Sequence, residues 1–185
     1  MKKYELTEET VTVYGKTLYR IRAVRDFGSV KTGEFGGYIE KEENLSHFGN
    51  AWISGDARVS GDARVFDNAK VYGDARVSGN AKVYGDARVS GDAWVYGNAW
   101  VYGNAEVFNT RHFFVQGPIG SRDGYVTFYR TKDDTIGVRC GCFSGSLQKF
   151  VDRVEETHGG SRYEKEYKIA AELAKVCIRL EGESR

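Results

Sequence analysis

Six side chains in the middle of the chain have the chemistry to hold a phosphorylated aromatic ligand. They are Arg76, Tyr84, Arg88, Trp94, Trp100 and Tyr102. Aromatic rings can stack on nucleobases, and an arginine can bind a phosphate through two parallel hydrogen bonds. The same residue types are enriched in subunit interfaces, and stacked rings stabilise neighbouring strands without any ligand. These residues therefore favour a subunit interface or strand stabilisation, with a ligand-binding surface as a further interpretation that is compatible with either, and we take them as candidate ligand contacts.

A second candidate site lies in the turn-rich segment 117–124, which reads GPIGSRDG. Successive backbone N–H groups in such a loop can surround an anion, and Arg122 adds a positive charge. Arg139 and His158 are further polar residues at or near glycines, where a backbone can approach a ligand closely. The alternative is that Ser-Arg-Asp-Gly is an ordinary hairpin turn.

Carboxylates and thiols give weaker indications of chemistry. Asp56, Asp74 and Asp92 are eighteen residues apart and could bind a cation if they stack, although aspartate at such positions is usually a turn former. Cys140 and Cys142 would share one face of a strand in or near the core. A zinc site needs about four ligands, which this pair does not supply. We predict no metal site and no cofactor.

The elements that position these residues are indicated by a period of six. Ten consecutive hexads begin at Gly49: GNAWIS, GDARVS, GDARVF, DNAKVY, GDARVS, GNAKVY, GDARVS, GDAWVY, GNAWVY and GNAEVF. Neither the period of a helix nor that of a long strand fits this pattern. A short strand with an inward valine, a corner of Gly and Asp or Asn, and a small inward alanine does fit it. The repeat therefore predicts stacked coils.

This pattern resembles the left-handed parallel β-helix of hexapeptide-repeat proteins, in which three hexads make one triangular coil. The resemblance implies left-handed winding and a homotrimer. It also implies that residues eighteen apart stack in columns. The expected outward columns are Phe66, Tyr84, Tyr102; Arg58, Arg76, Trp94; Arg64, Lys82, Trp100; and Trp52, Lys70, Arg88, Glu106.

Many proteins with this β-helix are acyltransferases that use an acyl-CoA donor and a histidine base, which makes acyl transfer an alternative function. A base must lie within hydrogen-bond reach of the acceptor. The three histidines, His47, His112 and His158, all lie outside the regular hexads, and no loop interrupts the hexads. We expect His47 and His112 to be surface or packing residues, and we assign no catalytic residue.

The segments on either side of the repeat predict a cap and a mixed module. We expect three regions: a β cap over 1–48, the β-helix over 49–112, and a strand-plus-two-helix module over 113–185. The cap has strand-like stretches at 10–14 and 18–24, and Ile39 and Leu45 suit a first imperfect coil. The module has candidate strands at 124–130 and 135–140. Ser146 and Ser161 suit the N-caps of two amphipathic helices, the second running to about Leu180.

The C-terminal module resembles that of uncharacterised prophage-associated hexapeptide-repeat proteins. Gly141–Gly145, Thr157–Gly159 and Tyr163–Tyr167 carry this resemblance, which implies a phage or prophage setting.

Charge and hydropathy exclude some classes of function. Lys and Arg total 27 and Asp and Glu total 26, so no positive surplus would attract nucleic acid or an anionic membrane. No apolar run approaches the length of a membrane span, and residues 1–5 lack the apolar core of a signal peptide. We expect a cytoplasmic protein with no membrane partner and no sequence-specific nucleic-acid partner.

The sequence thus predicts a mainly β fold: a left-handed parallel β-helix between an N-terminal β cap and a C-terminal α+β module. The function that we favour is a non-enzymatic, phage-type binding protein. It would sequester a nucleotide-like phosphorylated ligand or a host protein and so counter host defence. A purely structural oligomer is the third alternative.

Overall fold

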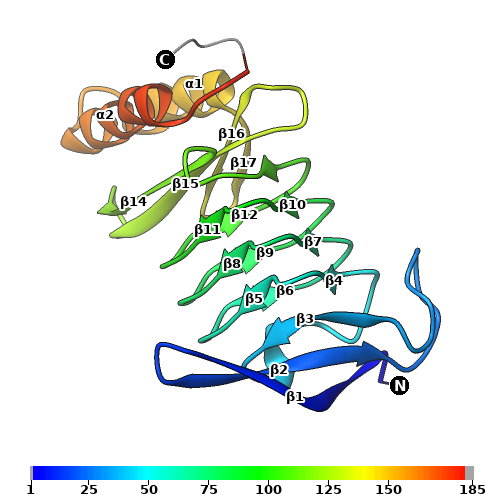
Figure 1. The fold of residues 1–185 in the computed structure, drawn as a ribbon. Coiled ribbons are helices and arrows are strands. Elements are labelled where there is room, and N and C mark those ends of the chain that lie inside the picture. The colour runs from blue at the N-terminus through cyan, green and yellow to red at the C-terminus, as the bar shows by residue number, and fades with distance from the viewer. Residues whose placement is uncertain (1, 182–185) are drawn as a thin grey trace.

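Ten strands of two residues each form the centre of the molecule, one strand in every hexad. Figure 1 shows them stacked as successive coils in a computed structural model that describes residues 2–181. Residue 1 and residues 182–185, the outer ends of the first and third expected regions, lie outside the described residues. The strands are β4 (Trp52–Ile53), β5 (Arg58–Val59), β6 (Arg64–Val65), β7 (Lys70–Val71), β8 (Arg76–Val77), β9 (Lys82–Val83), β10 (Arg88–Val89), β11 (Trp94–Val95), β12 (Trp100–Val101) and β13 (Glu106–Val107).

Strands eighteen residues apart pair in parallel and make three faces. One face holds β5, β8 and β11, the second holds β6, β9 and β12, and the third holds β4, β7, β10 and β13. Each strand points its valine or isoleucine inward, where it is fully buried together with the alanine of the hexad. The expected columns are confirmed, since Arg58 pairs with Arg76, Arg64 with Lys82, and Trp52 with Lys70. Apolar burial between coils therefore holds the centre together.

Glycine makes most corners because the backbone there has a positive φ angle. At Gly91, φ is +59° and an added Cβ would lie 2.3 Å from the carbonyl oxygen of Phe108 in the next coil. Asp67 takes this position in one hexad, also at +59°, and its carboxylate accepts a hydrogen bond from the N–H of Gly85 at 3.2 Å. Aspartate tolerates positive φ better than most side chains.

Stacked side-chain amides add hydrogen bonds between the coils. The side-chain amide of Asn50 donates to that of Asn68 at 3.1 Å, and Asn68 donates to Asp86 at 3.2 Å. The Asp56 column forms no metal cluster within the described residues. Its aspartates lie at the exposed corners of the coils.

An antiparallel sheet caps the first coil, as predicted. It contains β1 (Tyr4–Val13), β2 (Lys16–Ala23) and β3 (Phe35–Ile39), and β3 pairs in parallel with β5, so this sheet continues into one face of the solenoid. A short 3-10 helix, η1 (Glu42–Asn44), leads into the first coil. Strand β1 is longer than the predicted stretch 10–14, because its first half buries Tyr4 in the core.

The first coil is two residues longer than the others. Ile39 pairs with Val59 and Leu45 with Val65, which are spacings of twenty residues, whereas Ile53 pairs with Val71 at a spacing of eighteen. Leu45 is thus eight residues from Ile53, where the repeat has six. His47 and Phe48 lie in this longer turn, between Leu45 and Ile53, and Phe48 is exposed there.

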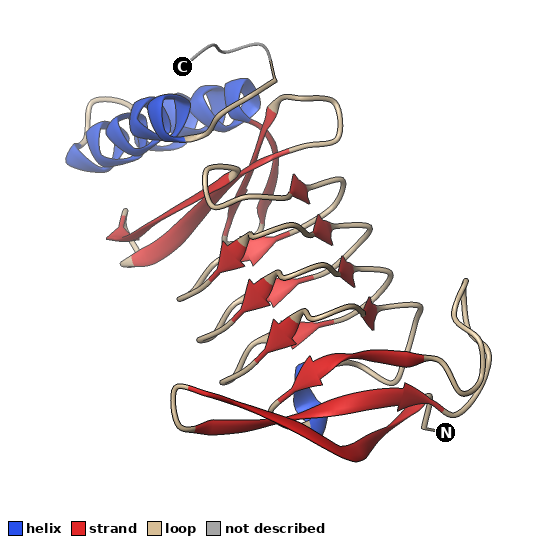
Figure 2. Ribbon diagram, viewed as in Figure 1, coloured by secondary structure: helices blue, strands red, loops and turns tan. Residues whose placement is uncertain are grey.

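A four-stranded antiparallel sheet and two helices cover the last coil (Figure 2). The strands are β14 (Phe113–Ile119), β15 (Gly124–Arg130), β16 (Ile136–Cys140) and β17 (Phe143–Ser146), and the helices are α1 (Leu147–His158) and α2 (Arg162–Cys177). Ser146 and Ser161 cap the helices through side-chain oxygens, as expected. No helix in the described residues is long and apolar enough to cross a bilayer.

Several local expectations for this module were wrong. The sequence did not predict β14 or β17, and β14 includes residues 117–119 of the expected loop. Helix α2 ends at Cys177, three residues before the expected end. Cys142 is exposed, because the chain turns at Gly141 and does not continue as a strand. The fold class itself is confirmed: a parallel-stranded solenoid between a β cap and an α+β module.

Candidate ligand-binding site

Two parallel rows of outward side chains follow the face formed by β6, β9 and β12. Arg64, Lys82 and Trp100 form one row, which we call the basic row after its first two members. Phe66, Tyr84 and Tyr102 form the other, which we call the aromatic row. Side chains two positions apart along an extended chain point to the same side, so the rows are separated by about 6–7 Å. We call the surface made by Arg64, Lys82, Trp100, Phe66, Tyr84 and Tyr102 the basic–aromatic face.

The aromatic row is a continuous stack. The ring centroids of Phe66 and Tyr84 are 4.7 Å apart at an interplanar angle of 11°, and those of Tyr84 and Tyr102 are 4.6 Å apart. Burial raises the pKa of Tyr84. The stack ends at Phe66, because the equivalent position of the first coil is Ser46, whose N–H donates to the carbonyl oxygen of Val65.

The basic row has no carboxylate partners. Among residues 2–181, neither Arg64 nor Lys82 has a carboxylate oxygen within 4 Å, although the two lie on adjacent rungs. Like charges placed opposite each other destabilise a sheet. A cation–π contact partly offsets this repulsion, because the Nζ of Lys82 lies 4.4 Å from the ring centroid of Trp100. An uncompensated pair of this kind attracts an anion.

Arg139 on β16 extends the basic row from the C-terminal module. Its guanidinium lies over the rings of Trp100 and Tyr102, 5.5 Å from each centroid. The backbone N–H of Trp100 donates to the hydroxyl of Thr127 at 2.9 Å, which fixes the module against this coil. The Nε of Arg139 is buried without a hydrogen-bond partner among the described residues.

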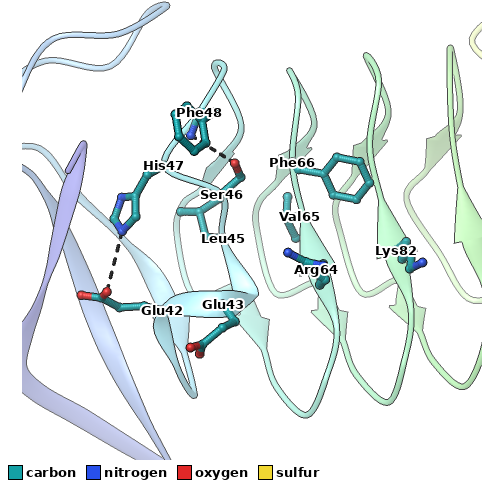
Figure 3. Close-up of a pocket in the computed structure, with 10 residues that line it drawn as sticks. All are labelled: Glu42, Glu43, Leu45, Ser46, His47, Phe48, Arg64, Val65, Phe66 and Lys82. Atoms are coloured by element: carbon teal, nitrogen blue, oxygen red, sulfur yellow. Dashed lines mark hydrogen bonds and ion pairs between the residues drawn. The ribbon is translucent and has the colours of Figure 1, made fainter. Parts of the chain in front are cut away.

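At the N-terminal end of the face, both rows open into a cavity of about 510 Å³. Figure 3 shows its lining, which we call the cap pocket: Glu42, Glu43, Leu45, Ser46, His47, Phe48, Arg64, Val65, Phe66 and Lys82. Phe48 and Phe66 project from neighbouring coils. The side chain of Phe48 is 81% exposed, which is unusual for a large apolar ring. Residues 46–48 of the longer first turn form part of the wall of this pocket.

His47 is held as a packing residue at the wall of the cap pocket. Its ring stacks on Tyr4 with centroids 4.3 Å apart, and its Nδ1 accepts the backbone N–H of Lys3 at 3.3 Å. The Nε2 faces Glu42 at 3.9 Å. Burial lowers the pKa of His47, against the opposing effect of Glu42. Because the Nδ1 lone pair is occupied and Nε2 then carries the proton, this imidazole is poorly placed to act as a base.

The predicted repeat residues do not all share one surface. Tyr84, Trp100 and Tyr102 lie on the basic–aromatic face, where Arg139 joins them. Arg76 and Trp94 stack on the β5–β8–β11 face, where the rings of Trp94 and Tyr96 form a separate pair. Arg88 lies on the third face, 3.7 Å from the carboxylate of Glu106.

Arg122 and His158 lie apart from the basic–aromatic face, in the C-terminal module. The ring of His158 is 5.7 Å from that of Tyr167, and Arg122 is exposed. The N–H of Gly120, part of the expected anion cradle, donates to the carboxylate of Glu166 at 2.7 Å. The protein's own acidic side chain therefore occupies this amide.

A second cavity of about 410 Å³ lies on the third face, between the segment 28–34 and the coils. Its lining includes the cations Lys70 and Arg88 and the carboxylates Glu34 and Asp86. The charges lining the two cavities balance in each case, but Arg88 of the second cavity already lies 3.7 Å from the carboxylate of Glu106, whereas Arg64 and Lys82 of the cap pocket have no carboxylate within 4 Å among the described residues. The cap pocket with its adjoining rows is therefore the stronger candidate for a phosphorylated ligand.

Sequence comparison identifies the repeats. The family model described as YdcK Beta solenoid repeat matches residues 51–67, 57–73, 69–84 and 81–97. These matches lie within the coils and include Arg64, Phe66 and Lys82, but not the longer turn or the C-terminal module. No curated protein matches the chain. The similarity thus concerns the solenoid and leaves the function to be argued from the site.

Proposed function

We propose that the protein is a non-enzymatic binding protein for a small phosphorylated, nucleotide-like ligand held on the basic–aromatic face. The observation that carries this proposal is an unpaired basic row beside a stacked aromatic row, with both rows opening into one cavity. Arg64 and Lys82 line that cavity together with Phe66. Phosphate oxygens accept strong hydrogen bonds from such cations, and aromatic rings accept stacked bases.

The electrostatic argument favours an anion over a neutral ligand. Arg64 and Lys82 repel each other across adjacent rungs, and no described carboxylate within 4 Å relieves this repulsion. A bound phosphate would do so and would form charge-assisted hydrogen bonds, each contributing about 1.5–3 kcal/mol. Glu42 and Glu43 lie on the far side of the cap pocket, so the phosphate is expected at the end formed by Arg64 and Lys82.

We also propose an oligomeric state and a biological setting, which follow from the resemblance to hexapeptide-repeat β-helices and from that to prophage-associated proteins. The solenoid would be of the left-handed hexapeptide-repeat type and would form homotrimers. The exposed rings of Trp94 and Tyr96, 39% and 51% accessible, would then be buried at the subunit interface. In the cytoplasm of a phage-infected host, such a trimer would sequester a nucleotide signal and so blunt host defence. Native mass spectrometry of the purified protein would reveal a trimer, whereas a monomer alone would contradict this assembly.

Titration calorimetry with ATP as the probe tests the binding function. We expect the double variant Arg64→Gln, Lys82→Gln to bind ATP at least tenfold more weakly than the unaltered chain, since two charge-assisted contacts are lost. Lys70→Gln is the matched control, because Lys70 has the same place in its hexad but lies on another face. Absence of ATP binding, or equal binding by the double variant, would refute the proposal.

A further inference from the structure

The aromatic row lacks its N-terminal member. Phe66 stacks on Tyr84 in near-parallel geometry, but the next position toward the cap is Ser46. A regular repeat would allow an aromatic residue there. The longer turn instead moves Phe48 out of register, and its exposed ring lines the cap pocket opposite the coil of Phe66 (Figure 3).

A planar ring of a ligand fits this vacant rung. The stack already accepts rings at centroid spacings of 4.6–4.7 Å, so a further ring on Phe66 would continue an arrangement that the protein itself uses. Phe48 supplies apolar surface on the other wall. An aliphatic ligand would gain the burial but not the offset stacking, which adds to the stabilisation of aromatic pairs.

The basic row determines where the anionic part of the ligand lies. Arg64 and Lys82 line the same pocket as Phe66, and the row continues past Trp100 to Arg139. Successive rungs are about 4.8 Å apart, so these cations are distributed over roughly 10 Å along the solenoid axis. A single phosphate cannot contact all of them, whereas a chain of phosphates can follow the row.

We propose that the cap pocket binds the base of a nucleoside polyphosphate as an additional ring on Phe66. The phosphate chain then runs along Arg64 and Lys82 toward Arg139. This inference rests on the proposed function and makes it specific, because it assigns the ligand an orientation and requires more than one phosphate.

Calorimetry with ATP, AMP and inorganic tripolyphosphate tests the inference. We expect ATP to bind at least tenfold more tightly than either AMP or tripolyphosphate. Phe66→Leu and Phe48→Ser should weaken ATP binding by roughly 5- to 150-fold, the range that loss of base stacking produces, and leave tripolyphosphate binding unchanged. Tyr72→Leu is the matched control, since Tyr72 follows its strand as Phe66 does but on the third face.

The outcomes separate the two proposals. If tripolyphosphate binds as tightly as ATP and Phe48→Ser has no effect, the orientation of the ring is refuted while anion binding on the basic row stands. If neither ATP nor tripolyphosphate binds, both proposals fall. If Phe66→Leu folds poorly, Phe48→Ser still tests the position of the base. Phe48 is 81% exposed, so this substitution should scarcely affect the stability of the protein.

Discussion

The guanidinium of Arg139 lies 5.5 Å from the ring centroid of Trp100, so a residue of the C-terminal sheet completes a surface that begins in the coils. Its side chain is partly buried and has no carboxylate within 4 Å among the described residues. Packing on the two rings of Trp100 and Tyr102 holds the charge in place. Arg139 is thus suited to bind an anion while it also joins two parts of the molecule.

Replacement of Arg139 by methionine separates these two roles. Methionine keeps an unbranched apolar stem on Trp100 but removes the charge, so the thermal stability should change little. The affinity for ATP should fall about tenfold, as expected for one lost charge-assisted contact. Titration calorimetry measures this change. Arg122→Met is the control in the same module, and equal losses in both variants would contradict the assignment of Arg139.

The corner glycines should differ in their tolerance of a side chain. Gly97→Ala places a Cβ in open space, so its cost is the strain of φ +65°, about 1–2 kcal/mol. Gly91→Ala adds a clash with the carbonyl oxygen of Phe108 and should cost at least about 1 kcal/mol more, because the next coil must move. Urea unfolding of both variants tests the difference. Equal stabilities would show that the coils shift freely.

The inward valines should dominate the stability of the coils. Val83→Ala removes two methyl groups from a fully buried position, and the free energy of unfolding should fall by about 2–3 kcal/mol. Val176→Ala, at a position that is 82% exposed, should stay within about 0.5 kcal/mol of the unaltered chain. Urea denaturation measures both changes. A loss below about 1 kcal/mol at Val83 would argue against tight packing between coils.

His112 should make the protein less stable in mild acid. Burial, assisted by the charge of Arg130, lowers its pKa to about 4. Between pH 6.5 and pH 4 the unfolded chain therefore binds a proton that the folded chain excludes, so the free energy of unfolding falls as the pH falls. The contribution of the neutral His112 side chain to the free energy of unfolding is fully present above pH 6.5, and it amounts to at most about 3 kcal/mol.

The variant His112→Gln isolates this effect, because glutamine does not titrate. Between pH 7.5 and pH 5, the unaltered chain should lose about 2 kcal/mol more of its unfolding free energy than the variant does. Urea titrations at the two pH values provide the measurement. Parallel losses in both proteins would mean that His112 binds its proton equally in the folded and unfolded states.

The coils and their columns could be predicted because the repeat encodes them directly. Each valine and alanine occupies an equivalent inward position, and each pairing follows from the eighteen-residue spacing. The stack of Phe66, Tyr84 and Tyr102 was therefore predictable before any coordinates were known. The same spacing also implied that Arg76 and Arg88 lie on faces other than that of Trp100, although all were considered as one candidate site.

The cap pocket could not be predicted from the repeat, because it depends on a departure from it. The two additional residues near His47 and Phe48 become visible only when Leu45 is paired with Val65. Arg139 was a candidate for a different reason, because Gly137 and Gly141 lie two residues away on either side, and its position over Trp100 depends on how β16 docks against the solenoid. Contacts between a repeat and a non-repeating module carry no periodic signal.

Because residues eighteen apart stack, the length of the basic–aromatic face is set by the number of complete turns in the solenoid. Duplication of residues 67–84 would insert one complete turn and shift everything after it by about 4.8 Å, without exchanging the three faces. On the basic–aromatic face, the new turn would add one further lysine, equivalent to Lys82, and one further tyrosine, equivalent to Tyr84. The length of the face and its positive charge would therefore increase together, by one rung and one lysine for each inserted turn.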